Sequence, residues 1–432
     1  MKKVSVFWFR RDLRVEDNHG LFQALSGPYP VLPIFIFDKA ILSRLPSKKD
    51  GRVEFIHDAL ADLKSSIVQQ SGDISIFHDH PLHVFEKLTN EYDVQAIYLN
   101  HDHEKYAIQR DEEIKHFAKS KKIGFHTYKD HVIFEKDEVL SGKGTPYTVF
   151  TPYANKWKER LRQEPLPFYP SQKLPNYINI KADFPSLELI GFAPSELPFP
   201  EKIVTDQLIK DYQASRDFPA IKGTSKLSVH LRFGTISIRS LVTQANGTSE
   251  TWLNELIWRD FYFNILYHFP HISNGLAFRK EYDNIQWRNN EVEFEAWKQG
   301  KTGYPMVDAG MRELNQTGFM HNRVRMVVAS FLVKHLLIDW RWGETYFAEK
   351  LLDYDFSANN GGWQWAAGSG CDAAPYFRVF NPSLQAQKFD PKFIYIKKWV
   401  PEFQELTYTN PIVNHEFARK RVLEVYKEAL GK

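Results

Sequence analysis

The sequence is almost free of cysteine and has no long apolar run. Cys371 is the single cysteine in 432 residues, so the chain cannot form an internal disulfide, which is typical of a reducing compartment. No stretch reaches the roughly 20 apolar residues that a membrane helix needs. The apolar start, Val4 to Phe9, is followed directly by Arg10 and Arg11 and is too short for a secretion signal. We therefore expect a soluble, cytoplasmic protein without membrane contacts, and we expect it to be a monomer.

A large excess of one charge is also absent. The formal net charge is +3, with 25% charged and 43% hydrophobic residues, which is the balance of an ordinary globular protein. This charge does not by itself require a nucleic-acid partner, although local basic patches can still bind one. Aromatic residues are abundant, at 15% with 11 tryptophans. They can form a large core, or some can stack on a flat ligand or on bases, and composition does not decide between the two.

The first 130 residues or so alternate between strand-like and helix-like segments. Short apolar runs of strand length lie at Val4–Phe9, Val31–Phe37, Ile74–Phe77 and Ala96–Leu99. Stretches with helical apolar spacing lie between them, notably at Arg52–Val68 and Glu104–Ala118. This alternation predicts an α/β domain with a doubly wound parallel sheet.

The dinucleotide-binding fingerprint G-x-G-x-x-G is missing after the first predicted strand. The chain has Arg10-Arg11-Asp12-Leu13-Arg14 at that place. Since the fingerprint glycines let the backbone approach a pyrophosphate, their absence argues against a Rossmann dehydrogenase.

The texture changes after the predicted α/β domain. Prolines are frequent from about residue 146 to residue 200 and should break any long element. Beyond them, helical spacing dominates, at Ser237–Gln244, Trp252–His268, Val292–Gln299, Met306–Thr317 and Met320–Trp340, with Gly318 as a helix stop. We predict an α/β domain over residues 1–130, a connector over 131–200 and an all-α domain over 201–432.

One predicted helix carries a carboxylate among aromatic residues. Trp252, Glu255, Arg259 and Tyr262 are spaced to share a face, with Trp258 beside it. A carboxylate in such surroundings has a raised pKa and can donate a hydrogen bond. The alternative is an ordinary Glu255–Arg259 pair on a solvated face.

The predicted helix Met320–Trp340 presents polar residues to two sides. Asn322, Arg323 and Met326 cover one arc, whereas Arg325 points about 160° away from Arg323 at 100° per residue. The two arginines would thus serve different surfaces, unless the residues are simply a polar helix start.

The segment from Asp353 to Pro382 has the most unusual composition. It contains Asn359-Asn360 and Gly361-Gly362 followed by Trp363 and Trp365. Paired glycines let a backbone approach a ligand closely, and the two tryptophans diverge in a helix as in a strand. Earlier in the chain, the run Gly223 to Ser228 places hydroxyls at a helix start, where they can cap the helix or hold phosphate.

Several long strings together resemble the photolyase/cryptochrome family. They are FWFRRDLRVEDN, ELIWRDFY, KTGYPMVDAGMREL, GFMHNRVRM, ANNGGWQWAAG and FNPSLQAQKFD. The likeness covers nearly the whole chain and is greatest to bacterial class I cyclobutane pyrimidine dimer photolyases. It implies that the α-helical domain binds FAD and that the α/β domain can hold a second, antenna chromophore.

The resemblance also implies roles for individual residues. FAD contacts are expected from Tyr212, Thr224, Ser225, Lys226, Leu227, Ser228, Trp252, Arg259, Arg325, Asp353, Tyr354, Asp355 and Asn359. The flipped dimer and the DNA backbone would meet Arg216, Glu255, Trp258, Tyr262, Asn322, Arg323, Met326, Trp365 and Arg378. Electrons would reach the flavin through Trp363, Trp340 and Trp287, and Asn359 would face flavin N5. No metal is expected.

The activity implied is light-dependent repair of UV-damaged DNA, with an electron passing from excited, reduced FAD to a cyclobutane dimer. One alternative is a blue-light receptor without catalysis. Asn359 argues against it, because plant-type receptors have Asp and animal-type receptors Cys at the matching place; the short chain after the last motif also leaves no long signalling tail. A second alternative is repair of (6-4) photoproducts, where relatives place His at Arg323 or Met326. A third is repair of single strands, and a fourth is a flavin- or nucleotide-binding protein without light chemistry.

The identity of the antenna is left open between folate, deazaflavin and lumazine types. Folate-binding relatives carry an Asn-Glu pair where this chain has Tyr106-Ala107, and a lysine of their helical domain is replaced near Asn274. Loss of a charge-assisted contact should weaken folate binding. Tyr106 could stack on a flavin-like ring instead, the site could be empty, or Glu104 could replace the missing carboxylate.

Overall fold

A computed structural model describes residues 1–431, which form two compact units. The first unit comprises Met1–Glu138, Trp157–Ile203 and Lys226–Asn246. The second comprises Val139–Lys156, Val204–Ser225 and the chain from Gly247 onward. Contacts thus divide the chain differently from the predicted boundaries, because most of the predicted connector and the segment 226–246 pack with the N-terminal residues.

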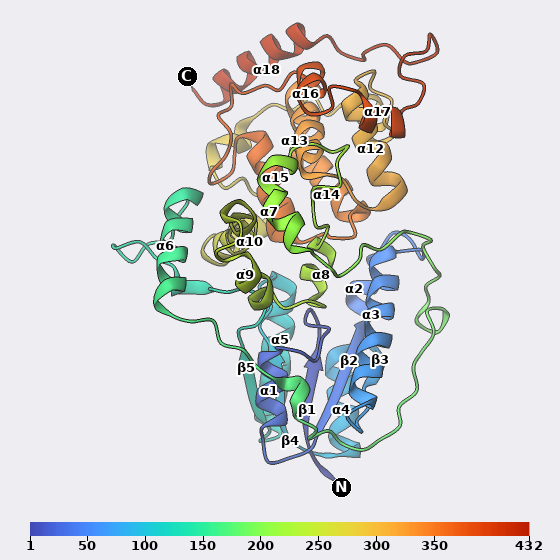
Figure 1. Ribbon diagram of the computed structural model, residues 1–432, viewed down its shortest axis with the longest axis vertical. Helices are drawn as coiled ribbons and strands as arrows, with labels where there is room; N and C mark the ends of the chain where they lie inside the picture. The colour runs from blue at the N-terminus through green and yellow to red at the C-terminus, as the bar shows by residue number, and fades with distance from the viewer. Residues whose placement is uncertain (432) are drawn as a thin grey trace. The chain divides into compact units, whose positions relative to one another are not determined.

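The first unit contains the predicted doubly wound parallel sheet (Figure 1). Its strands are β1 (Lys3–Phe9), β2 (Val31–Asp38), β3 (Ser75–Asp79), β4 (Asp93–Asn100) and β5 (Gly124–Tyr128). The order is β3-β2-β1-β4-β5, and every pairing is parallel. The strand order therefore reverses between β1 and β4, the place where ligands of open α/β sheets usually bind.

The helices of this unit bury both faces of the sheet. They are α1 (His19–Leu25), α2 (Lys39–Leu42), α3 (Gly51–Val68), α4 (Pro81–Glu91), α5 (Lys105–Ser120), α8 (Ser228–Phe233) and α9 (Ile238–Ala245). Along β1, Val4, Val6 and Trp8 belong to one hydrophobic cluster with α4 and α5. Because side chains alternate along a strand, Phe7 and Phe9 are buried on the opposite face.

Several elements were not expected from the sequence, and three of them show why. β5 is a half-exposed edge strand with little apolar signal, and α4 is a short helix between two strands. The Pro-rich connector contains a 14-residue helix, α6 (Phe150–Gln163). The prediction that proline breaks every long element there was wrong, since Pro152 lies in the first turn of α6, where the missing N–H is tolerated.

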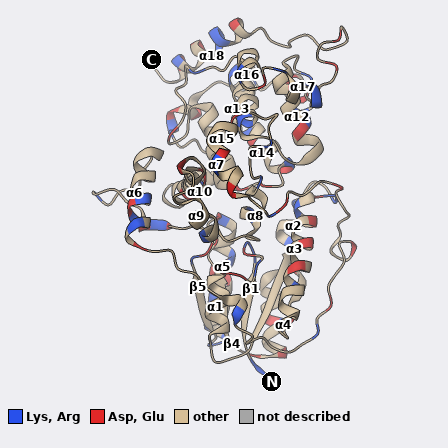
Figure 2. Ribbon diagram, in the orientation of Figure 1, with Lys and Arg blue, Asp and Glu red and all other residues tan. Residues whose placement is uncertain are grey.

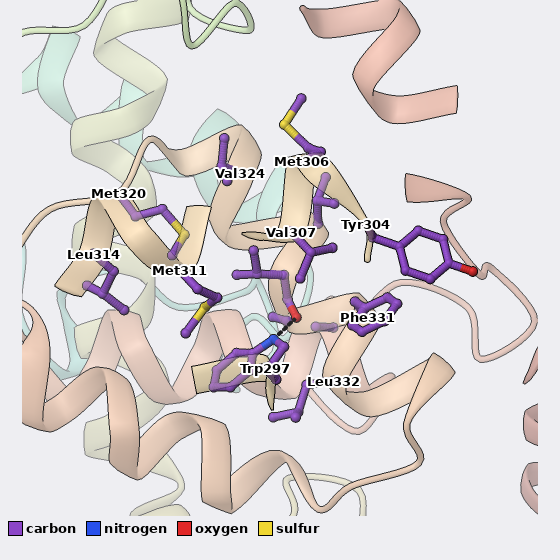
Figure 3. Close-up of a cluster of buried hydrophobic side chains, with 14 of the residues drawn as sticks. Trp297, Tyr304, Met306, Val307, Met311, Leu314, Met320, Val324, Phe331 and Leu332 are labelled. Atoms are coloured by element: carbon purple, nitrogen blue, oxygen red, sulfur yellow. Dashed lines mark hydrogen bonds between the residues drawn. The ribbon is translucent and has the colours of Figure 1, made fainter. Parts of the chain in front are cut away.

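The second unit is helical around one large apolar core. Its remaining helices are α7 (Asp206–Ser215), α10 (Glu250–His268), α11 (Glu291–Lys298), α12 (Pro305–Thr317), α13 (Asn322–Ser330), α14 (Trp340–Lys350), α15 (Phe356–Ala367), α16 (Pro382–Phe389), α17 (Ile394–Trp399) and α18 (His415–Ala429). Trp297 lies in that core and donates its indole N–H to the carbonyl of Val328 at 3.1 Å (Figure 3). The second unit also has short helical turns at η4 (Pro270–Asn274) and η5 (Lys280–Asn284). The first unit has such turns at η1 (Lys136–Glu138), η2 (Ser171–Lys173) and η3 (Glu188–Ile190).

The predicted helix from Met320 to Trp340 is divided into three pieces. Gly318 ends α12 with a φ of 65°, as expected for a helix stop. α13 then continues into a π-helical turn, η6 (Phe331–His335), and Leu337 has a φ of 53° before Trp340 begins α14. The single-helix prediction was wrong because apolar spacing continues through a left-handed break. Within residues 1–431, no helix combines the length and hydrophobicity needed to cross a membrane.

Candidate cofactor and substrate cavity

The second unit contains a cavity of about 380 Å³ between its central helices, a size typical of small-molecule sites. Residues of α10, α13, α14 and α15 form most of its wall. The lining residues are Arg216, Glu255, Trp258, Tyr262, Asn322, Arg325, Met326, Ala329, Phe347, Leu351, Asp353, Tyr354, Asp355, Ala358, Asn359, Gly362, Trp363 and Trp365. The structure thus brings together seven of the nine residues predicted for the lesion and the DNA, and five of the thirteen predicted for FAD.

Helix α15 presents one face to this cavity. Asp355 caps the helix, and its carboxylate accepts from the backbone N–H of Ser357 at 3.1 Å. The face continues at Ala358, Asn359 and Gly362, which are three to four residues apart along the helix. A Cβ on Gly362 would meet no atom within 4 Å, so this turn of backbone is open toward the cavity.

The neighbouring glycine has another purpose. A Cβ on Gly361 would lie 2.2 Å from the ring of Tyr262, far inside van der Waals contact. Gly361 therefore lets α15 pack against α10, and only Gly362 fits the prediction that a paired glycine admits a ligand.

Arg325 and Asp353 form the predicted ion pair at the cavity wall. The guanidinium donates to both carboxylate oxygens of Asp353, at 2.9 and 3.2 Å, and to the carbonyl of Met320 at 2.8 Å. Both bonds to Asp353 come from Nη2, and the bond to Met320 comes from Nε, so two nitrogens of the guanidinium are held and its plane is fixed. The charges are mutually neutralised while their polar edges line the cavity.

Asn359 is held by an acid that the sequence did not indicate. Its amide N–H₂ donates to the backbone carbonyl and to the side chain of Glu344, both at 3.1 Å. Burial raises the pKa of Glu344, and the bond from Asn359 opposes that shift only in part. The amide N–H₂ of Asn359, and not its oxygen, therefore faces Glu344. Glu344 lies on α14, so no local sequence spacing could have indicated the pair.

Glu255 pairs with Arg216 rather than with Arg259. Arg216 donates to the Glu255 carboxylate, and the two side chains are 30% and 31% exposed. Burial raises the pKa of Glu255, and the charge of Arg216 opposes the shift. The raised pKa agrees with the expectation for a carboxylate among aromatics, whereas the Glu255–Arg259 pair is not formed. Arg259 instead lies 5.0 Å from the ring of Phe263.

Two tryptophans offer aromatic surface at this cavity. Trp258 is stacked on Phe150 with ring centroids 3.7 Å apart and an interplanar angle of 2°. Phe150, at the start of α6, was not expected at the site; it fixes the plane of Trp258. Trp365 lies 6.3 Å from Phe380.

Arg323 points away from Arg325, as its helical spacing predicts, but it does not line the cavity. It donates to Asp217 at 2.6 Å and lies 4.2 Å from the ring of Phe389. Met326 lines the cavity and contacts Arg323 through its sulfur at 3.9 Å.

The three tryptophans of the predicted electron path share the core of the second unit. Trp363 and Trp340 are each 2% exposed, and Trp287 packs against the same cluster. A Cβ on Gly343 would lie 2.1 Å from the ring of Trp363, so glycine makes room for that ring. Trp363 also contacts Trp297, with centroids 6.1 Å apart.

The other predicted contacts lie outside the cavity lining. Trp252 is buried in α10, Arg378 is exposed, and Tyr212 lies 5.5 Å from the guanidinium of Arg216. Thr224 and Ser225 belong to the second unit, whereas Lys226, Leu227 and Ser228 belong to the first. The capping alternative for this run is wrong, because Leu227 is the N-cap of α8 and no side chain caps it. The phosphate-binding role stays a prediction.

In the first unit, charged side chains of the chain itself fill the carboxyl end of the sheet at the β1–β4 reversal. Arg10 donates to Asp111 at 2.6 Å, and Arg11 donates to Asp102 and Glu104 at 3.2 and 3.1 Å. Burial works against the charge of Asp102, but Arg11, Arg10 and Arg110 outweigh it and hold its pKa well below the usual range. The cavity that remains there has only about 10 Å³.

Tyr106 is hydrogen-bonded and flanked by cations at the same end of the sheet. Its hydroxyl donates to Asp38 at 2.7 Å, and burial with the Asp38 contact raises its pKa to about 12. The guanidinium groups of Arg44 and Arg110 each lie 5.8 Å from its ring. Two cations therefore already flank the ring of Tyr106. The carboxylate of Glu104 is paired with Arg11. Neither side chain is held ready for a folate.

The second unit has the chemistry that a flavin ring needs. Its cavity combines a backbone turn open at Gly362, apolar walls from Phe347 and Leu351, and the polar edges of Arg325, Asp353 and Asn359. Such a set suits a flat ring with polar atoms along its edges. The class of protein that this α/β unit and this helical unit with its cavity fit is a flavoprotein.

Comparisons with known proteins give the family. Residues 5–171 match the model "DNA photolyase", and residues 252–407 match "FAD binding domain of DNA photolyase". The deoxyribodipyrimidine photo-lyase of Synechococcus sp. is 36% identical, over 99% of this chain and 97% of that protein. The chain belongs to the DNA photolyase family, and its cofactor is FAD.

Solved structures agree with this assignment. An archaeal photolyase from Sulfolobus tokodaii, which holds two FAD molecules, is similar with a TM-score of 0.84 and 37% identity, over 99% of this chain and 100% of that chain. A cryptochrome from Synechocystis sp. is similar with a TM-score of 0.84 and 25% identity, over 98% and 99% of the two chains. The predicted fold, an α/β unit with a helical FAD-binding part, is thereby confirmed.

Proposed function

We propose that this photolyase repairs cyclobutane pyrimidine dimers in DNA under blue light. The observation that carries the proposal is a shared cavity. The resemblance assigns Glu255, Trp258, Asn322, Met326 and Trp365 to the dimer. They line the same cavity as five residues that it assigns to the flavin: Arg325, Asp353, Tyr354, Asp355 and Asn359. A dimer in this cavity would be in reach of the cofactor without a further pocket.

The lesion side of the cavity is suited to two adjacent, linked bases of one strand that are flipped out of the duplex. Flipping costs a few kcal/mol and least for damaged bases. Stacking on Trp258 or Trp365 would offset that by about 1–3 kcal/mol per base. Phe150 keeps Trp258 in one orientation, so less side-chain entropy is lost when a base stacks on it. Glu255, when protonated, can donate a hydrogen bond to a pyrimidine carbonyl.

The cofactor side is suited to holding an electron-rich ring. Arg325, fixed by Asp353, places donors at the cavity wall, and Asn359, fixed by Glu344, offers an amide that does not titrate. When bound, reduced FAD supplies the electron that splits the cyclobutane ring after it absorbs blue light. Trp363 lies on α15 in the hydrophobic core and would carry electrons toward the cofactor from Trp340 and Trp287.

The alternative is a blue-light receptor that changes partners without catalysis. Asn359 favours repair over a plant-type or animal-type receptor, because those receptors have Asp or Cys, respectively, at the matching position. Glu255 and Met326, which the resemblance assigns to the dimer, line the cavity and also favour repair.

Three oligonucleotides test the proposal: one with a cyclobutane thymine dimer, one with a (6-4) photoproduct, and one undamaged. The reduced protein is illuminated with each, and the bases are identified by mass spectrometry. We expect restored thymines from the cyclobutane dimer alone. Restoration of the (6-4) product alone, or of neither lesion while reduced FAD is bound, would contradict it.

A further inference from the structure

Two charged side chains that line the cavity, Arg216 and Glu255, and two outside its lining, Asp217 and Arg323, form a closed set of two ion pairs. Arg216 pairs with Glu255, and Arg323 pairs with Asp217. Arg216 and Asp217 are adjacent in the chain, and the guanidinium of Arg216 also lies 4.0 Å from the carboxylate of Asp217. The set is electrically neutral as it stands. Acidic and basic residues are interspersed over both units (Figure 2), so the cavity is balanced by these local partners rather than by a large excess of one charge.

The two pairs differ in how a ligand would reach them. Arg216 is 30% exposed and lines the cavity together with Glu255. Arg323 is 18% exposed and has its guanidinium over the ring of Phe389. A DNA phosphate that reaches the cavity can therefore bind Arg216 in place of Glu255. A guanidinium binds phosphate with forked, charge-assisted hydrogen bonds, which compete directly with its bond to Glu255.

We propose that binding of damaged DNA withdraws Arg216 from Glu255 and that the complex takes up one proton on the Glu255 carboxyl. The inference rests on the proposed function, because the dimer is the ligand that brings phosphates to the cavity. It adds a coupling: contact with the DNA backbone converts Glu255 from the acceptor of an ion pair into the hydrogen-bond donor that the lesion needs.

The surroundings explain why Glu255 rather than Asp217 takes the proton. Asp217 keeps Arg323 as its partner after Arg216 leaves. Glu255 would then have no cation, with Asp217 nearby as a like charge, and burial already raises its pKa in the free protein. A carboxylate that loses its counter-ion in a desolvated cavity favours its neutral form.

The other titratable groups around Glu255 do not supply or take that proton. Burial first, and the Glu255 charge second, raise the pKa of Tyr212 from α7, so its hydroxyl stays neutral. Burial likewise raises the pKa of Tyr262 from α10. Burial lowers the pKa of His321, the N-cap of α13, to about 4, so it stays neutral too. Of the remaining charges at the cavity, Arg325 is paired with Asp353, and Asp355 caps α15.

Proton uptake is measured by calorimetry. A dimer-bearing oligonucleotide is titrated into the FAD-loaded protein in the dark at about pH 7, in two buffers with different ionisation enthalpies. The wild-type protein should take up roughly one proton per complex, and its affinity should fall by up to about tenfold per pH unit as pH rises. Glu255→Gln should bind without uptake. Arg216→Gln should lose most of the uptake, because its Glu255 lacks the counter-ion before DNA binds.

Arg378→Gln is the matched control, since it removes an exposed arginine of the same unit that is not paired with Glu255. It should keep the uptake of the wild-type protein even if affinity falls. Equal uptake in the wild-type protein and in Glu255→Gln, or none in either, overturns the inference. If the wild-type protein repairs dimers yet takes up no proton, the inference alone fails; if it neither binds nor repairs them, the proposed function fails.

Discussion

The two units each contain a cluster of two arginines and two carboxylates, and the clusters differ in exposure. In the first unit, Arg239 donates to Asp17 at 3.0 Å and to Asp130 at 2.8 Å, and Arg14 donates to Asp130 at 2.7 Å. Those four side chains are 1–8% exposed. In the second unit, the side chains of Arg216, Glu255, Asp217 and Arg323 are 18–39% exposed.

The difference shows which ion pairs a ligand can exchange. Asp130 also accepts from the backbone N–H of His19, and Asp17 accepts from that of Tyr169, so the first cluster joins distant segments of its unit through side chains that are almost fully buried. In the second cluster, Arg216 and Glu255 line the site cavity and are 30% and 31% exposed, so a phosphate or a base can replace a partner there. Charge substitutions in the first cluster should therefore change stability, and those in the second should change binding and repair.

The largest effect is expected at the buried side of the cavity. Trp363→Phe should abolish light-driven reduction of oxidised FAD, because the path from Trp340 loses its first residue beside the cofactor. Repair by chemically pre-reduced protein should survive. The flavin absorbance under illumination with an added reductant measures both states; a variant that still photoreduces at the wild-type rate would show that electrons take another route.

The buried cluster should show its importance in unfolding. Arg239→Met leaves Asp17 and Asp130 without a main partner and should lower the free energy of unfolding by about 3–5 kcal/mol, measured by denaturant titration. Burial works against the charge of Asp130, but Arg14 and Arg239 outweigh it and lower its pKa to about 2. This folded-state pKa lies below the unfolded value of about 3.9. The stabilisation is therefore present above that value and is lost as pH falls toward about 2. An unfolding curve like that of the wild-type protein would refute the structural role of the cluster.

The exchangeable cluster should respond the other way. Glu255→Ala should lower repair roughly ten- to hundredfold, the loss of one buried hydrogen bond to the lesion. Its free energy of unfolding should change by less than about 1 kcal/mol, as expected for a partly exposed pair. Glu255→Gln keeps a donor and the shape and should retain much of the repair. Equal repair by all three proteins would remove this role from Glu255.

The smallest effect concerns the sheet edge of the first unit. Since Arg11 and Glu104 are paired and Tyr106 is held by Asp38, we expect weak binding of a folate there. Chromophores released by heat from protein made in its native host, and identified by mass, should be FAD alone or FAD with a flavin-like compound. A stoichiometric amount of methenyltetrahydrofolate would contradict this expectation.

Local sequence patterns predicted the fold class and part of the residues that line the cavity. Four strands, the helices α3, α5, α9, α10, α11 and α12, and the start of α13 were predicted within a few residues, because apolar residues recur in each at the spacing of its element. β5 was missed because it is polar and half-exposed, and the break at Leu337 because no residue type indicates a left-handed leucine. The partners of the site residues, Asp217, Glu344 and Phe150, come from other elements, so only the folded chain shows them.

Recovery of thymine in the light tests the central claim most directly. The FAD-reduced protein is mixed with oligothymidine carrying cyclobutane dimers, and the absorbance of intact thymine near its ultraviolet maximum is followed in blue light and in darkness. We predict recovery in the light with many turnovers per protein, and none in the dark. The absence of recovery in the light, with FAD bound and reduced and the oligonucleotide bound, would contradict the proposed function.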